Sequence, residues 1–96
     1  MDILFHLSGE NAGPLLLGFG AACHRAGVSW ACFLTNDGVK VLADKAVRSV
    51  LKDAQRTVVC EHSWKRHMGK AEIPVERGSQ TTNSILMAEA DQVVSL

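Results

Sequence analysis

The sequence predicts an α/β fold in which a mainly parallel sheet of about five strands carries helices on both faces. Short apolar runs bounded by turn residues alternate with segments of helical periodicity, as in repeated β-α-β units. Apolar residues make up 47% of the chain, enough for a core without disulfide bonds. The 96 residues are predicted to form one domain, residues 1–96.

The first quarter of the chain predicts a strand and the clearest helix. Residues 3–7 are almost all apolar, as in a strand that is covered on both faces. Pro14 fits the first turn of the following helix, and Gly27 fits the position just past its end. The helical spacing predicts this inward face: Leu15, Phe19, Ala22, Cys23 and Ala26.

The next segment predicts a second strand followed by shorter helices. Residues 28–34 form an apolar strand, which the turn residues Thr35–Gly38 end. Residues 39–43 predict one or two helical turns. Asp44 is placed to cap a further helix that runs to about Ala54. The inward residues of that helix are predicted to be Val47, Val50 and Leu51.

A third strand and a short helix follow. The β-branched run 57–60 predicts the strand, and residues 62–68 predict the helix, which Gly69 ends. Cys60, Trp64 and Met68 recur four residues apart, which is typical of one helix face.

The last quarter of the chain completes the pattern. Pro74 confines the extended segment 73–75 to a sheet edge or a loop. Ser79 is placed to cap a helix from about Gln80 to Ala90, and residues 92–96 predict the last strand. The inward residues of this helix are predicted to be Ile85, Leu86 and Ala90.

Charge and cysteine content exclude several classes of protein. Ten basic and ten acidic residues give a formal net charge of zero, which argues against nucleic acid and against a charged membrane surface. No apolar run reaches the roughly 20 residues of a membrane span, and the apolar N-terminus lacks the basic leader of a signal peptide. Three widely spaced cysteines without a CxxC indicate free thiols in a reducing cytoplasm. Near-zero charge on a small domain favours a homo-oligomer.

Cys60 is the main candidate for chemistry because it lies where a strand gives way to a helix. The positive end of a helix favours the thiolate, which is the nucleophilic form. His62 follows two residues later, and Lys65 and Arg66 add positive charge. The alternative is that Cys60 is a small buried hydrophobe. Core packing is the better interpretation of Cys23 and Cys32.

Three loops are predicted at the carboxyl ends of the strands, where ligands bind in parallel sheets: Ser8–Asn11, Thr35–Gly38 and Cys60–His62. Ser8 and Gly9 open a strand-to-helix loop that resembles a phosphate loop, but this loop has no GxGxxG and no GK[ST]. Asn36 and the acidic Asp37, Glu10 and Glu61 lie near the same rim. The histidine spacing predicts no metal set, and a site of Cys60, His62 and a third ligand has no support from spacing.

The order of four segments resembles the DsrE/DsrF-like family, which includes the TusD-type sulfur-relay proteins. The first strand and loop lead to a long helix that ends in HRAGV (residues 24–28). An apolar strand then passes into a DGV element in CFLTNDGV (32–39), and the next strand closes on a cysteine in VVC (58–60). The chain ends in AEADQVVSL (88–96), similar to the close of family members. The resemblance covers essentially the whole chain.

This resemblance implies a flavodoxin-like three-layer sandwich that assembles into trimers or hexamers. In sulfur-relay members the cysteine at the end of this strand accepts sulfur as a persulfide, and by position that residue is Cys60. Sulfur donor and acceptor proteins are the implied partners, and no cofactor is required. Asn36, Asp37, Glu61 and His62, with the Ser8–Gly9 loop, are the expected supporting groups. Two alternatives stay open: an oligomeric scaffold module with an inert Cys60, and a small-molecule or nucleotide binder at the strand rim.

Overall fold

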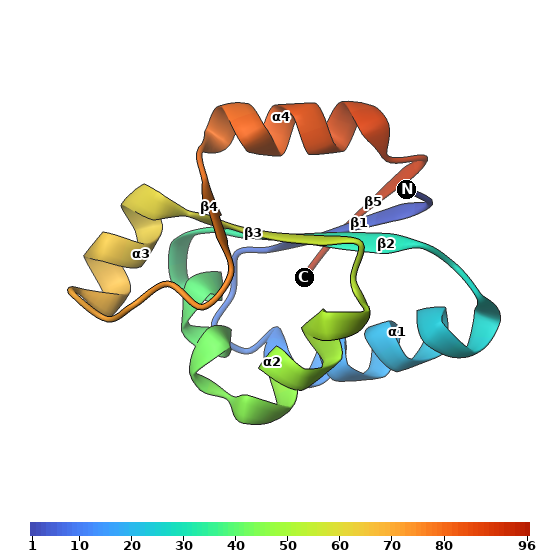
Figure 1. The fold of residues 1–96 in the computed structure, drawn as a ribbon, viewed down its shortest axis with the longest axis horizontal. Helices are drawn as coiled ribbons and strands as arrows, with labels where there is room; N and C mark the ends of the chain where they lie inside the picture. The colour runs from blue at the N-terminus through green and yellow to red at the C-terminus, as the bar shows by residue number, and fades with distance from the viewer.

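The computed structural model describes residues 1–96 and alternates strands with helices along the whole chain (Figure 1). The strands are β1 (Ile3–Leu7), β2 (Trp30–Leu34), β3 (Arg56–Cys60), β4 (Glu76–Gly78) and β5 (Gln92–Ser95). The α-helices are α1 (Gly13–Ala26), α2 (Lys45–Val50), α3 (Glu61–Met68) and α4 (Gln80–Glu89). Two 3₁₀-helices, η1 (Asn36–Ala43) and η2 (Leu51–Asp53), flank α2.

All five strands pair in parallel, in the order β4-β3-β2-β1-β5. Figure 1 shows α1 and α2 on one face of the sheet and α4 alone on the other, with α3 beyond the end of β3. The predicted α/β fold, a flavodoxin-like three-layer sandwich, is therefore confirmed in its layers. The strand order differs from the 2-1-3-4-5 order of flavodoxin itself.

Side-chain alternation along the strands divides the core into two clusters. The larger cluster lies on the α1 and α2 face, where Trp30 meets Phe5 edge-on with ring centroids 5.6 Å apart. The smaller cluster lies under α4, and Leu86 is the fully buried residue that the helix contributes. The members of this smaller cluster are Leu4, Ala31, Phe33, Val58, Cys60 and Leu86. Cys60 therefore faces the side of the sheet that a single helix covers.

The local signals in the sequence are confirmed at the ends of the elements. Pro14 lies in the first turn of α1, and Gly27 ends this helix in the left-handed conformation with φ of 68°. The Asp44 carboxylate accepts a hydrogen bond from the Ala46 N–H at the start of α2. Ser79 forms a capping box with Thr82 at the start of α4. Each of these signals depends on a few neighbouring residues.

Two predicted inward faces are only partly right. In α1 the buried residues are Gly13, Leu16, Gly20 and Cys23. Leu15 and Phe19 are 53% and 45% exposed, because the buried face is rotated by about one residue from the predicted one. A Cβ on Gly20 would lie 3.3 Å from the Trp30 ring, so this glycine brings α1 close to β2. In α4, Leu86 is buried and Ala90 packs against the smaller cluster as predicted, but Ile85 is 51% exposed.

The predicted helix face of Cys60, Trp64 and Met68 is not a single face in the structure, because these residues lie on opposite sides of the sheet. Trp64 and Met68 pack on the α1 and α2 side of the sheet, whereas Cys60 joins the cluster under α4. Cys60 is the last residue of β3, so strand alternation and not helical spacing sets the direction of its side chain. None of the helices is both long enough and apolar enough to cross a membrane.

Candidate functional site

A cavity of about 480 Å³ lies at the carboxyl ends of β2, β3 and β4. It is lined by residues from the end of β2, the start of α3 and the start of α4: Thr35, Asn36, Cys60, Glu61, His62, Ser63, Lys65, Gly78, Ser79 and Gln80. Parallel strands bring their carboxyl ends to one edge, so these segments meet there although they are far apart in sequence. The starts of α3 and α4 both contribute to the lining, which places two positive helix ends at the cavity.

Cys60 lines this cavity at the junction between β3 and the first turn of α3. Its side chain is 5% exposed and packs in the cluster under α4. A sulfur atom in this position is shielded from bulk water but borders an open cavity. A reaction partner must therefore bring its own reacting atom into the cavity.

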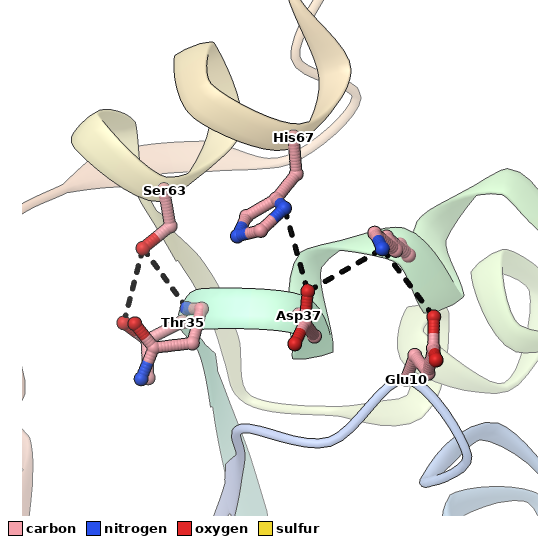
Figure 2. A network of polar contacts seen from close by, with 7 residues as sticks. Glu10, Thr35, Asp37, Ser63 and His67 are labelled. Atoms are coloured by element: carbon pink, nitrogen blue, oxygen red, sulfur yellow. Dashed lines mark hydrogen bonds and ion pairs between the residues drawn. The ribbon is translucent and has the colours of Figure 1, made fainter.

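Hydroxyl and amide groups around the thiol form a network, and Figure 2 shows the part of it in which Ser63 contacts the segment at Thr35. The Ser63 Oγ lies 3.3 Å from the Thr35 Oγ1 and accepts a hydrogen bond of 2.9 Å from the Asn36 N–H. The Gln80 side chain donates to the Thr35 Oγ1 at 3.1 Å. Asn36 has a positive φ of 51°, a left-handed conformation that asparagine tolerates better than most residues. This network ties the end of β2 to α3 and to α4.

These groups change the acidity of Cys60. Burial is the largest influence and by itself would raise the pKa of the thiol. Hydrogen bonds from the Ser63 side chain, from the backbone N–H groups of Ser63 and His62, and from the Thr35 hydroxyl favour the thiolate. Together they outweigh burial, so the pKa of Cys60 is lowered.

The other two cysteines are shifted in the opposite direction. Burial raises the pKa of Cys32, and burial followed by the Asp2 carboxylate raises the pKa of Cys23. Neither residue lies at the cavity, and all three cysteines are free of disulfide bonds. Cys60 is therefore the one thiol in the chain that its surroundings activate.

A second polar cluster lies beside the cavity and is also drawn in Figure 2. The Asp37 carboxylate lies 3.4 Å from the His67 Nδ1 and 3.3 Å from the Lys40 Nζ, and the Lys40 Nζ also lies 3.3 Å from the Glu10 carboxylate. His67 and Ser63 are four residues apart on α3, so one side of this helix contacts the segment Thr35–Asp37 twice. The cluster links the loop after β1 with η1 and α3.

The predicted site residues divide into three groups. Asn36, Glu61 and His62 line the cavity with Cys60. They belong to two of the three loops predicted at the carboxyl ends of the strands. Asp37 belongs to the adjacent cluster with His67. Ser8 and Gly9 do not line the cavity; the Ser8 N–H instead donates to the Leu96 carbonyl at 3.2 Å.

Glu61 lies on the outer rim, within 3.7 Å of the Lys65 Nζ and 3.5 Å of the Arg77 guanidinium. All three of these side chains are substantially exposed, so their ion pairs contribute little to stability. Both signs of charge are present at the mouth of the cavity.

Three residues hold the thiol environment together: Ser63, Thr35 and Gln80. The sequence predicted the loop that begins at Thr35 but gave Thr35 no role, and it did not place Ser63 or Gln80 at the site. Ser63 lies three residues after Cys60, and this i, i+3 spacing in the first turn of a helix is a usable signal. Thr35 directly follows β2, the strand that neighbours β3. Gln80 depends on the position of α4, which no short-range pattern in the sequence reveals.

A larger cavity of about 580 Å³ lies elsewhere, between α2 and the amino-terminal ends of β3 and β4. Its basic residues are Lys45, Arg48, Lys52 and Arg56, but no cysteine, serine–histidine pair or other nucleophile-and-base set lies there. The chemistry therefore points to the smaller cavity. No group of three or more histidine, cysteine, aspartate or glutamate side chains is arranged to hold a metal ion.

Comparisons with known proteins add no functional assignment. No protein-family model matches the chain, and no curated protein matches it significantly. The geometry around Cys60 is therefore the feature that indicates a function.

Proposed function

We propose that the protein is a sulfur carrier that accepts sulfur on Cys60 as a persulfide and passes it to another thiol. The observation that carries this proposal is the environment of Cys60, whose pKa is lowered by hydrogen-bond donors although the residue is buried. A thiolate at neutral pH is the form that attacks sulfur. The cavity supplies a route for the incoming sulfur atom.

The transfer balances without a cofactor. The Cys60 thiolate attacks the outer sulfur of a donor persulfide, a bond forms between the two sulfur atoms, and the donor leaves as a thiolate. In the second step an acceptor thiolate attacks the outer sulfur on Cys60, which regains its own thiolate. Hydrogen bonds from Ser63 and Thr35 stabilise the negative charge of Cys60 before the first step and after the second.

The partners in this proposal are a sulfur donor protein and an acceptor protein. Because Cys60 is 5% exposed, a partner must present its sulfur on an extended segment that reaches into the cavity. Membership of the DsrE/DsrF-like family, a trimeric or hexameric assembly and a cytoplasmic location belong to the same proposal and rest on the resemblance in sequence order. Three free cysteines suit a reducing compartment.

The test is incubation of the native protein with a persulfide donor, followed by intact-protein and peptide mass spectrometry. We expect one added sulfur atom, located on the peptide that contains Cys60, and none on Cys60→Ser. Cys23→Ser is the matched control and should still take up sulfur. An unmodified native chain, or equal uptake by Cys60→Ser, would contradict the proposal.

One observation favours a second candidate, a binding or scaffold module in which Cys60 is inert. The side chain packs against Phe33, Val58 and Leu86 and shows little surface to water. Titration with a thiol reagent separates the two functions. An inert Cys60 reacts only after unfolding, whereas the proposed carrier reacts in the native state, through Cys60 alone.

A further inference from the structure

The two edges of the sheet differ in how they are protected against pairing with another chain. The β4 edge follows Pro74 and carries Glu76 and Arg77, and charged residues and proline are common protections of an exposed edge. The β5 edge is Gln92–Ser95, which contains no charge, no proline and no glycine. Only β4 therefore carries the usual protection.

The hydrogen-bonding groups of β5 alternate between β1 and solvent. The Gln92 N–H donates to the Asp2 carbonyl at 2.9 Å, and the Leu96 N–H donates to the His6 carbonyl at 2.8 Å. In a parallel ladder alternate residues bond to the same neighbour, so the backbone groups of Val93 and Ser95 point away from β1. These two residues present two donors and two acceptors at the edge.

Apolar side chains flank this edge on both faces of the sheet. Val93 is 40% exposed and pairs with Leu4, so it lies on the α4 face. On the other face, Phe19 contacts Phe5 of β1 with ring centroids 5.7 Å apart, and Leu15 lies one turn away on the same side of α1. These three are among only five large apolar side chains that the chain exposes.

We propose that two copies of the chain pair through β5, antiparallel about a two-fold axis, with Val94 opposite Val94 of the second copy. In this register Val93 lies opposite Ser95 of the second copy, and the outward groups of both strands form four backbone hydrogen bonds. Pairing in this way keeps the α4 faces of the two copies on the same side of the joined sheet. The exposed apolar residues beside each β5 edge therefore meet across the axis. The two five-stranded sheets become one continuous sheet.

A second copy fits this edge better than an unrelated partner because a two-fold axis places each residue near its own equivalent. Charged residues at such an axis would repel their counterparts, and β5 has none. The outward N–H and C=O groups of β5 also match those of an antiparallel second β5 in number and spacing. The β4 edge fails the first condition, since Glu76 and Arg77 lie on it.

This interface does not involve the Cys60 cavity. The cavity lies at the ends of β2, β3 and β4, whereas β5 lies at the opposite edge beyond β1. Pairing through β5 therefore leaves the thiol accessible to a partner. The interface and the sulfur-carrier function can succeed or fail separately, because sulfur uptake and chain mass are measured independently.

Mass measurement in solution tests the interface. We expect light scattering with size-exclusion chromatography to give the mass of two chains, or of a multiple of two, and Val93→Pro or Val93→Lys to halve it. Proline removes the outward N–H of Val93 and leaves the hydrogen bonds to β1 intact, and lysine introduces an edge charge. Thr81→Lys, which adds the same charge on the exposed side of α4, should leave the mass unchanged.

Disulfide cross-linking tests the register. In a Cys60→Ser background, Val94→Cys should give a cross-linked dimer on mild oxidation, because the two Cα atoms would lie about 4.5 Å apart. Ser95→Cys should not, since its equivalent is displaced by two residues along the strands. A monomer at all concentrations up to the millimolar range overturns the proposal. A trimer also overturns it, because pairing through β5 is compatible with a hexamer but not with three chains. An oligomer that both Val93 variants leave intact, while circular dichroism shows them folded, overturns it as well.

Discussion

Replacement of Ser63 by alanine is expected to slow alkylation of Cys60 at neutral pH by about tenfold, which corresponds to the loss of one hydrogen bond to a charged group. The Ser63 side chain is the strongest of the groups that lower the pKa of Cys60. Without the Ser63 hydroxyl, the remaining hydrogen bonds offset less of the rise in pKa that burial causes. Thr35→Val should act in the same direction by a smaller factor, because Thr35 contributes least among these groups.

The pH dependence of the alkylation rate shows directly in which direction the pKa of Cys60 is shifted. The lowered pKa means that native Cys60 ionises below the 9.0 of an ordinary thiol, so its rate should reach half of its plateau below that pH. In Ser63→Ala the midpoint should move upward. The native chain also binds fewer protons at Cys60 than the unfolded chain does. The thiolate therefore contributes stability that is complete above pH 9.0 and is lost as pH falls through the native pKa.

The matched control for this experiment is Ser84→Ala. Ser84 is an exposed helical serine whose hydroxyl donates to the Gln80 carbonyl, outside the cavity lining. Its removal should leave the alkylation profile of Cys60 unchanged. A Ser63→Ala profile that overlays the native one would show that the hydroxyl does not stabilise the thiolate.

The parts of the fold that the sequence predicted are those fixed by short-range physical chemistry. Gly27 ends α1 because a left-handed residue must follow the last turn, and Ser79 starts α4 because it forms a capping box with Thr82. Cys60 is at a strand-to-helix junction because the β-branched run ends there. Each of these features needs only a few neighbouring residues.

The remaining features depend on how the elements pack, which no short segment determines. The inward face of α1 is set by Gly20, which brings α1 close to Trp30 and Val50 and rotates Leu15 and Phe19 outward. Helical spacing alone is consistent with both the predicted and the observed inward face of α1, because both contain apolar residues. The predicted face was therefore only partly right although the helix was right.

The roles of the groups that activate the thiol were missed for the same reason, although the loop that begins at Thr35 was predicted at the rim. Thr35, Ser63 and Gln80 are spread over almost half of the chain, and each is an ordinary polar residue when it is considered alone. The strand order brings the ends of β2 and β3 together, and α4 then adds Gln80. The predicted parallel sheet placed the loop that begins at Thr35 at the rim, but Gln80 required the three-dimensional position of α4.

Gly38→Ala is expected to destabilise the fold by about 3 kcal/mol or more, because overpacking against rigid backbone cannot be relieved by a side-chain rotation. A Cβ at this position would collide with the carbonyl group of Leu7, where η1 passes over the end of β1. Gly18→Ala is the matched control. Nothing lies within 4 Å of its Cβ position in α1, so alanine should stabilise the chain by about 0.5–1 kcal/mol.

Gly38→Ala also tests whether the packing of η1 on β1 positions the groups around the Cys60 thiol. Gly38 keeps η1 against β1, with the Thr35 N–H donating to the Leu7 carbonyl at 2.9 Å, and this contact positions Asn36 against Ser63. If alanine moves η1 away from β1, then the Thr35 and Ser63 hydroxyls lose their alignment with Cys60. Urea denaturation should therefore show the loss of stability, and alkylation under native conditions should show a slower Cys60 in the folded fraction. Stability equal to that of Gly18→Ala would mean that η1 shifts freely, and an unchanged alkylation rate would separate the thiol from this contact.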